Sequence, residues 1–314
     1  MGNKNNEKRA RPFLKWAGGK KQVINCIDKI LPQEIKDSEA IENYFEPFLG
    51  GGAIFFHLVS KYTVNNAYLA DINKELILTW RVIQNKPKKL ISRLEKLSNS
   101  YLELSQDERK KFYYDIRDEK FNKNLKGFDY TELGEDQIVR ASQMIFLNRT
   151  CFNGLYRVNK SGKFNVPMGK YKNPSICDKE NILKVHKKLK GVNIVCEDYH
   201  KSAISVDENS FFYLDPPYLP IKKTSFTSYD SSGFGIKEQI ELSKFCKKLD
   251  ENDVKFILSN SDPKNHDPNC DFFKNAYGNL GLSVCNHKKI EVRRSINSKG
   301  HKRGPINELL IYNY

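Results

Sequence analysis

Short apolar runs alternate with amphipathic stretches along most of the chain, and the two patterns predict different elements. The runs are too short for helices and rich in aromatic and β-branched residues, so they predict buried strands. They lie at residues 44–48, 67–70, 192–196, 211–214, 254–258, 289–292 and 309–312. Apolar positions spaced by three and four, with charges between them, predict helices. These lie at residues 53–59, 75–117, 137–146, 180–190 and 236–250.

Strands and helices alternate at both ends of the chain, whereas its middle is helical and charged. Such alternation is typical of an α/β domain built on a sheet. Residues 118–135 are polar and contain glycine, so we expect loops there. The pattern predicts one α/β domain, made of residues 1–75 and 186–314, that is interrupted by an inserted domain at 76–185.

Charge and cysteine usage narrow the class of protein. The 314 residues include 53 Lys and Arg against 38 Asp and Glu, a net charge of +15, which favours a polyanionic partner, nucleic acid before membrane. A lysine-rich proteome would give the same excess. No stretch approaches the roughly 20 apolar residues of a membrane span, and the polar first residues do not form a secretory signal. Seven scattered cysteines without a CxxC pair indicate reduced thiols, so we expect a cytoplasmic protein without a metal site.

Residues 210–218 end an apolar run with an acid, two prolines and a tyrosine. Because prolines cannot continue a strand, Asp215 is predicted at the carboxyl end of a buried strand, where open α/β sheets bind ligands. The carboxylate of Asp215 and the carbonyl of Pro216 can accept both hydrogens of an amine, and Tyr218 offers a flat face. Taken alone, the segment would equally fit a strand that ends in a proline turn.

A glycine-rich turn, Phe48-Leu49-Gly50-Gly51-Gly52, follows the first predicted strand, and Asp71 ends the second. Glycines allow a ligand to approach the backbone, and a carboxylate at the second strand can accept hydrogen bonds from a ribose diol. A dinucleotide fingerprint would need a third glycine where Phe55 stands. The turn therefore favours a nucleoside without a pyrophosphate.

The segment Lys15-Trp16-Ala17-Gly18-Gly19-Lys20 places a tryptophan beside a pair of glycines and between two lysines. Such a loop can fold over a bound nucleoside, with Trp16 as a wall and Lys20 near a carboxylate. A surface arm that is docked by one buried tryptophan is the alternative.

Aromatic residues alternate with Arg, Asn and Lys between residues 147 and 167, around a Ser-Gly turn, which predicts a hairpin. Arg can bind guanine and Asn can bind adenine through paired hydrogen bonds, and Phe152 can wedge into a base stack. An ordinary structural hairpin would have a similar composition.

In this order, Lys-Trp-Ala-Gly-Gly-Lys, Phe-Leu-Gly-Gly-Gly, Asp71 and Asp-Pro-Pro-Tyr resemble the motifs of the Dam-type (α-class, D12) DNA adenine-N6 methyltransferases. The resemblance runs from Arg11 to Tyr312. It implies a Rossmann-like methyltransferase fold with an inserted, mainly helical recognition domain that carries a β-hairpin. It also implies S-adenosyl-L-methionine as the methyl donor and double-stranded DNA as the substrate, with a flipped-out adenine methylated at N6, within 5′-GATC-3′.

The same resemblance implies roles for individual residues. The implied catalytic residues are Asp215, Pro216 and Tyr218. The implied cofactor residues are Trp16, Ala17, Gly18, Lys20, Glu46, Pro47, Phe48, Gly50, Gly52, Asp71, Asp198, Tyr199 and Asp215. The implied DNA-binding residues are Phe152, Asn153, Leu155, Arg157 and Pro167.

Three other classes of protein share parts of this pattern. An RNA or protein-amide N-methyltransferase could use a similar acid-Pro-Pro-aromatic turn but would lack the hairpin. A DNA-binding module without catalysis would not need Asp71 or Asp215, and a nicotinamide oxidoreductase would need the third glycine. The sequence does not distinguish an orphan or phage-borne enzyme from one with a companion restriction endonuclease that shares its site without direct contact.

Overall fold

The fold comes from a computed structural model of the 314-residue chain. It describes residues 9–16, 20–123, 125–203, 206–218, 234–265, 267–278, 286–293 and 305–314.

The chain forms two compact units, each assembled from separate segments. Unit 1 contains residues 1–19, 50–61 and 72–196, and unit 2 contains residues 20–49, 62–71 and 197–314. The predicted inserted domain, residues 76–185, therefore lies entirely in unit 1. Unit 1 also includes residues 1–19, 50–61, 72–75 and 186–196. A recognition role for residues 76–185 stays a prediction.

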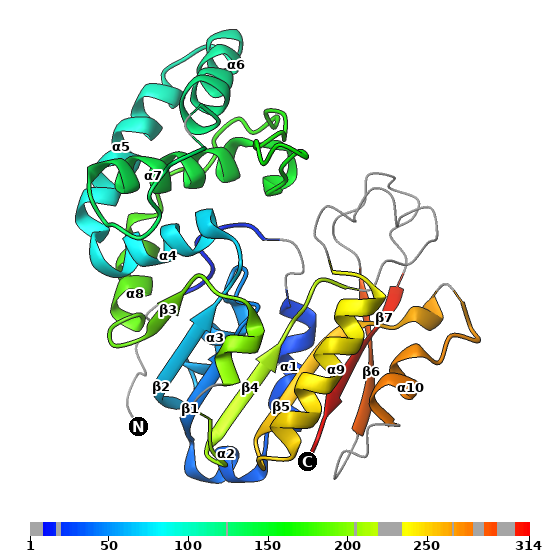
Figure 1. The fold of residues 1–314 in the computed structure, drawn as a ribbon. Coiled ribbons are helices and arrows are strands. Elements are labelled where there is room, and N and C mark those ends of the chain that lie inside the picture. The colour runs from blue at the N-terminus through cyan, green and yellow to red at the C-terminus, as the bar shows by residue number, and fades with distance from the viewer. Residues whose placement is uncertain are drawn as a thin grey trace, which may run out of the picture. The chain divides into compact units, whose positions relative to one another are not determined.

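Unit 2 is built on a mostly parallel sheet with helices (Figure 1), which confirms the predicted α/β class. Its strands run in the order β2-β1-β4-β5-β7-β6. The pairs β2–β1, β1–β4 and β4–β5 are parallel, and the pairs β5–β7 and β7–β6 are antiparallel. The strands are β1 (Ala40–Glu46), β2 (Thr63–Ala70), β4 (Ser210–Leu214), β5 (Lys255–Ser261), β6 (Asn286–Arg293) and β7 (Pro305–Tyr312).

Strand β4 is the buried centre of this sheet. All five of its residues are buried, which explains why it appears in the sequence as a continuous apolar run. Phe212 stacks on Phe45 of β1 with ring centroids 4.5 Å apart, and both pack into the core beneath α9. The helices of unit 2 are α1 (Lys21–Ile30), α2 (Gln33–Ser38), α9 (Ile236–Asp250) and α10 (Phe272–Gly278), with short helical turns η3 (Tyr199–Ala203) and η6 (Pro263–Asn265).

The register of the parallel strands brings three chain segments to one edge of the sheet. Glu46, at the end of β1, pairs with Leu69 of β2, and Phe45 pairs with Phe212 of β4. Because parallel strands point the same way, the residues that follow β1, β2 and β4 emerge together at their carboxyl ends. The amide of Leu49 donates to the carbonyl of Ala70 over 2.9 Å, which fixes the turn after β1 against the end of β2.

Unit 1 is mainly helical, and some of its helices begin with side-chain caps. The side chain of Asn73 accepts from the amide of Leu76 at the start of α4, and Ser105 and Glu108 form a capping box at α6. The helices are α3 (Ala53–Leu58), α4 (Lys74–Asn85), α5 (Pro87–Leu102), α6 (Gln106–Tyr114), α7 (Glu135–Thr150) and α8 (Lys179–Lys188). The shorter elements are a π-helical turn η1 (Asp115–Phe121), a helical turn η2 (Phe152–Gly154) and a strand β3 (Asn193–Val195).

A buried ion pair joins α4 to α7 inside unit 1. Arg140 and Glu75 are 4% and 6% exposed, and Nε of Arg140 lies 2.8 Å from Oε2 of Glu75. The hydroxyl of Tyr130 donates to the same carboxylate over 2.6 Å. The guanidinium also lies 4.5 Å from the ring centre of Phe121 and 4.6 Å from that of Phe128. Both charges are therefore hydrogen-bonded as well as paired, which is the condition for burying them.

Several element boundaries differ from those expected. Strand β1 begins at Ala40, earlier than predicted, because its first half alternates buried and exposed residues and lacks a continuous apolar run. The predicted helical stretch 75–117 is divided into α4, α5 and α6, with Pro87 opening α5. Within the ranges that the structure describes, none of the helices combines the length and the apolar character that a bilayer span requires.

Removing one partner of the buried ion pair should destabilise unit 1 strongly. Arg140→Met leaves the Glu75 carboxylate buried without its counter-charge, so we expect the free energy of unfolding to fall by about 3–5 kcal/mol. Urea denaturation followed by circular dichroism measures this loss. The control is the double variant Glu75→Leu/Arg140→Met, which replaces both charges and should recover more than half of the loss. Equal destabilisation of the single and double variants would contradict this account.

Candidate functional site

Three predicted site residues of unit 2 meet at the carboxyl end of β4. Nζ of Lys20 lies 2.8 Å from Oδ1 of Asp215, the residue that follows the strand. The same ammonium contacts the hydroxyl of Tyr218 and lies 4.4 Å from the centre of its ring. The Lys20 side chain is only 3% exposed, so this ion pair is shielded from solvent.

Burial and charge act in opposite directions on this pair. Burial raises the pKa of Asp215 to about 6, although the neighbouring Lys20 ammonium lowers it, and Glu308 raises it further. For Lys20, burial lowers the pKa, but Asp215, Tyr218 and Glu308 together raise it above its ordinary value. Lys20 therefore stays protonated at neutral pH, and Asp215 titrates near the acidic edge of the physiological range.

The sequence analysis missed Glu308, the second acidic group near Lys20. Oε2 of Glu308 lies 4.0 Å from Nζ of Lys20, and it is buried without a hydrogen bond from any described residue. Glu308 lies within β7, opposite Ser261 of β5. The available signal was a charged residue directly before the predicted apolar run 309–312, because a carboxylate that becomes buried there needs a partner.

The turn after Asp215 is fixed by hydrogen bonds as well as by its prolines. The side-chain amide of Gln239 donates to the carbonyl of Pro217 over 3.0 Å, and the hydroxyls of Tyr218 and Ser259 lie 3.4 Å apart. Pro216 is buried, and its ring fixes its φ angle. The Asp215 carboxylate and the Pro216 carbonyl are therefore held by a constrained backbone.

The ends of β1 and β2 carry further predicted residues. Glu46, the last residue of β1, is 2% exposed and accepts from the hydroxyl of Tyr44 over 2.7 Å. Pro47 is buried beside it, and Asp71 is half-buried directly after β2. By the strand register, these residues lie along the same edge of the sheet as Asp215.

Phe48 and Tyr199 form an aromatic pair within unit 2, with ring centroids 5.2 Å apart. Tyr199 is buried, and its hydroxyl-bearing ring also packs against Phe245 of α9. Asp198 is exposed, and it accepts a hydrogen bond from the amide of His200 over 3.0 Å. The two adjacent residues thus differ in environment. The Tyr199 ring packs in an aromatic cluster with Phe48 and Phe245, whereas Asp198 lies on the surface.

The predicted residues of unit 1 include Trp16 and the glycine turn. Gly50 has a φ of +48°, and a Cβ atom there would lie only 2.8 Å from Cδ1 of Trp16. Glycine is therefore required at this position both for its backbone angle and for the close approach of the indole. Gly52, with a φ of +66°, precedes α3 as its N-cap residue.

The predicted DNA-reading residues lie on two chain segments that pair irregularly. The isolated antiparallel bridges Cys151–Met168 and Val158–Phe164 join these segments, in place of continuous strands. The amide of Phe152 donates to the carbonyl of Pro167 over 2.8 Å. We call residues 151–168 the recognition loop.

Four of the five predicted recognition residues are exposed, and Leu155 is half-buried. Phe152 is 50% exposed, which is unusual for a large apolar side chain. Asn153 has a φ of +57°, and Arg157 donates to the side-chain oxygen of Asn165 over 2.7 Å. The loop thus presents an aromatic, an amide and a guanidinium group to solvent.

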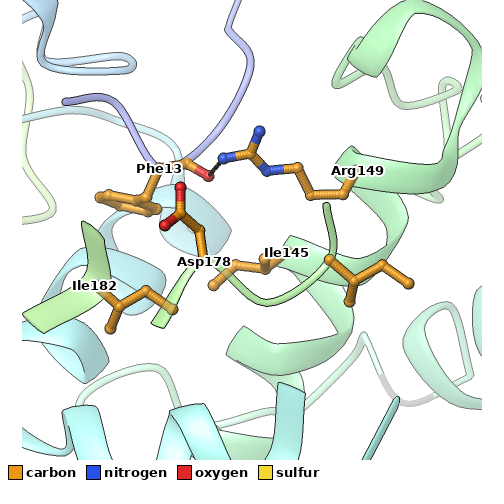
Figure 2. A pocket seen from close by; sticks show the side chains of 6 residues that line it. Phe13, Ile145, Arg149, Asp178 and Ile182 are labelled. Atoms are coloured by element: carbon orange, nitrogen blue, oxygen red, sulfur yellow. Dashed lines mark hydrogen bonds between the residues drawn. The ribbon is translucent and has the colours of Figure 1, made fainter. Parts of the chain in front are cut away.

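A small pocket in unit 1 lies beside Phe13 and is lined by residues of α7 and α8 and of the segment between them (Figure 2). It holds none of the predicted catalytic, cofactor or DNA-binding residues. Its lining residues are Phe13, Ile145, Arg149, Ile176, Asp178 and Ile182. Two predicted cofactor residues, Ala17 and Gly18, lie outside the described residues.

Comparison with known proteins identifies the chemistry that this architecture serves. The family model described as D12 class N6 adenine-specific DNA methyltransferase matches residues 16–296. The Type II methyltransferase M.MjaIII of Methanocaldococcus jannaschii is 47% identical over 306 residues, covering 97% of this chain and 99% of its own length. The Type II methyltransferase M1.LlaDCHI of Lactococcus lactis is 36% identical, covering 97% and 95%. The DNA adenine methylase of Escherichia coli is 32% identical, covering 96% and 95%.

These matches extend over nearly the whole chain and confirm the resemblance that the four sequence motifs indicated. Enzymes of this class use S-adenosyl-L-methionine as the methyl donor. The chain belongs to the D12 class of N6 adenine-specific DNA methyltransferases.

Proposed function

We propose that the protein methylates N6 of a flipped-out adenine within 5′-GATC-3′ in double-stranded DNA, with Asp215, Pro216 and Tyr218 as the catalytic residues. The observation that carries this proposal is the constrained Asp-Pro-Pro-Tyr turn at the end of β4, whose carboxylate is held by Lys20 over 2.8 Å. An amine that is bound at such a turn meets two fixed oxygen acceptors and an aromatic face.

The residues at this sheet edge are chemically suited to the cofactor. S-adenosyl-L-methionine carries a ribose diol, an aromatic base and positive charge on its sulfonium and amino groups. Asp71 would accept from the diol, and the aromatic pair Phe48 and Tyr199 would contact the base. The buried Oε2 of Glu308, which accepts no hydrogen bond from a described residue, suits a positively charged donor. When bound, the cofactor supplies a methyl group that its sulfonium activates for transfer to an amine.

The substrate base must leave the duplex before these residues can reach its amine. Unpairing and unstacking an adenine costs a few kcal/mol. Stacking of the extruded base on the Tyr218 ring would offset part of this cost. Lys20 lies beside that ring and is protonated at neutral pH because its pKa is raised, so it would also hold the tyrosine in place as the base arrives.

Asp215 and Pro216 would activate the amine by accepting its two hydrogens. Oδ1 of Asp215 pairs with Lys20, and a carboxylate has about four acceptor positions on its two oxygens, so the ion pair does not exhaust its capacity. Hydrogen bonds to both hydrogens draw the nitrogen towards a tetrahedral geometry and free its lone pair. Because the acceptors are fixed beforehand, orientation and electrostatics supply most of the rate gain.

The recognition loop would supply sequence specificity. Arg157 can bind guanine O6 and N7, Asn153 can bind adenine, and Phe152 can enter the stack where a base leaves it. The excess of lysine would add affinity through phosphates without sequence information. The inserted segment 76–185 would then act as the recognition domain.

The first test is methylation of an unmethylated plasmid by the protein with S-adenosyl-L-methionine. We expect the product to resist a nuclease that is blocked by methylated GATC and to be cut by one that requires it. Plasmid incubated without the cofactor is the control. Incorporation of methyl groups at other sites only would contradict GATC and leave the N6 chemistry standing.

Removal of the Asp215 carboxylate should separate catalysis from DNA binding. We expect Asp215→Ala to lower the methylation rate by at least roughly a thousandfold, because an acceptor aimed at the reacting amine is lost. DNA affinity in a gel-shift assay should stay within about threefold, since phosphate and groove contacts supply it. The matched control is Glu208→Ala, which removes an exposed carboxylate near the opposite end of β4. An equal loss of DNA affinity in Asp215→Ala would refute this division of roles.

The methylation rate should depend on pH through Asp215. Its pKa is about 6, and the deprotonated form is the acceptor. We therefore expect kcat/KM to be level above pH 6 and to fall by roughly tenfold per pH unit below it. Lys20 contributes no step in this range because its pKa is raised. Steady-state kinetics measure the profile, with circular dichroism at each pH as the control for folding. A constant kcat/KM down to pH 5 would argue against Asp215 as the acceptor.

A further inference from the structure

The segment before the glycine pair, residues 11–15, is held in unit 1 by side chains of α7 and α8. Asn181 of α8 accepts from the amide of Arg11 over 3.0 Å and donates to its carbonyl over 2.9 Å. Arg149 donates to the carbonyl of Phe13 over 2.6 Å, as Figure 2 shows. Asn148 of α7 accepts from the amide of Lys15 over 2.8 Å and donates to its carbonyl over 2.9 Å. The anchored residues are therefore Arg11, Phe13 and Lys15, at and on either side of a bend at residues 13 and 14.

Asn148 differs from Asn181 in one respect. Its second amide hydrogen is donated to the carbonyl of Gly154, in the recognition loop, over 3.0 Å. Asn148 is 0% exposed, and only one orientation of its amide satisfies all three hydrogen bonds. One buried side chain therefore binds the segment that leads into Trp16 and the loop that carries the predicted DNA-reading residues.

A second contact between the same two segments is independent of Asn148. The ring of Tyr156, in the recognition loop, stacks on Trp16 with centroids 5.3 Å apart and planes 20° apart. Gly50 also lies against the indole, too closely to accept a Cβ atom. Gly154 likewise has a φ of +65° and lies under the side chain of Lys15, with no room for a Cβ atom.

We propose that Asn148 and Tyr156 are positioning residues that couple cofactor binding to DNA recognition. A shift of the Trp16 segment would break the hydrogen bonds that Asn148 shares with the recognition loop, and a shift of the loop would unstack Tyr156 from Trp16. Each ligand therefore orders the segment that the other ligand uses. The inference rests on the proposed roles of Trp16 and the recognition loop. Because coupling between ligands is reciprocal, DNA should raise cofactor affinity by the same factor by which the cofactor raises DNA affinity.

The test measures binding of S-adenosylhomocysteine to the full chain by calorimetry, with and without a saturating duplex that carries the methylated site. For the wild type we expect the duplex to raise affinity by a factor of about five or more. Asn148→Ala and Tyr156→Leu should each reduce that factor to below about two. A residue that merely stabilised the fold would lower both affinities together and leave the factor unchanged.

Each variant has a matched control in the same unit. Asn181→Ala removes the equivalent anchor at Arg11, and Tyr171→Leu removes a ring that contacts Lys15 and not Trp16. The coupling factor of both controls should stay within about twofold of the wild-type value, even if the substitutions lower thermal stability. If Asn148→Ala does not fold, Tyr156→Leu tests the coupling by itself. The Tyr156 ring is only half-buried, and its removal leaves the hydrogen bonds of the Asn148 side chain in place.

The outcomes separate this inference from the proposed function. The coupling factor is the factor by which the duplex raises affinity for S-adenosylhomocysteine. If the wild type methylates the plasmid but has a coupling factor of one, the coupling is overturned and the proposed function stands. Equal coupling factors in Asn148→Ala, Tyr156→Leu and their controls would also overturn it. Failure of the wild type to methylate GATC sites would contradict the proposed function and would appear before any variant is compared.

Discussion

The charged ammonium of Lys20 constrains the edge of the sheet at which β4 ends. Its side chain is 3% exposed, and an ammonium without partners at such a position would cost several kcal/mol. Asp215 and Glu308 offset that cost, so the segment before α1, the end of β4 and the middle of β7 are tied to one buried charge. The cluster joins the parallel and antiparallel parts of the sheet. It also holds the Asp-Pro-Pro-Tyr turn in shape through contacts within the chain.

The sequence predicted β4 and β5 because these strands are buried on both faces and therefore contain apolar runs. Of β1 and β2 it predicted only the second halves, which are the more buried. Helix α1 was not predicted, although Val23, Ile27 and Ile30 are buried at helical spacing. The residues directly before it, Gly18-Gly19-Lys20, are typical of a loop. The order of the strands could not be predicted, since it depends on pairings between distant segments. Asp215 and Lys20 were each predicted as site residues. Their ion pair, and the position of Glu308 near the same ammonium, depend on the pairing of distant strands and could not be predicted from the sequence.

The contacts of two buried asparagines also could not be predicted from the sequence. Asn181 lies in a predicted helix, whereas Asn148 fell within the predicted hairpin and lies instead in the last turn of α7. Neither position in the sequence indicates that its amide contacts the backbone of residues 11–15. Asn–backbone anchoring satisfies buried polar groups that would otherwise carry a desolvation penalty. The buried pair of Arg140 and Glu75 follows the same rule with charges. Unit 1 is therefore specified by polar contacts in its interior as well as by apolar packing.

The anchoring of residues 11–15 also bears on self-association. Backbone that lies outside helices and sheets can display free amides and carbonyls to which another chain can add as a strand, and proteins guard such groups against aggregation. Here the backbone groups of Arg11 and Lys15 are already occupied by side-chain amides, and the carbonyl of Phe13 by a guanidinium. The segment can thus lie outside any helix or sheet without offering those groups as a template for a second copy.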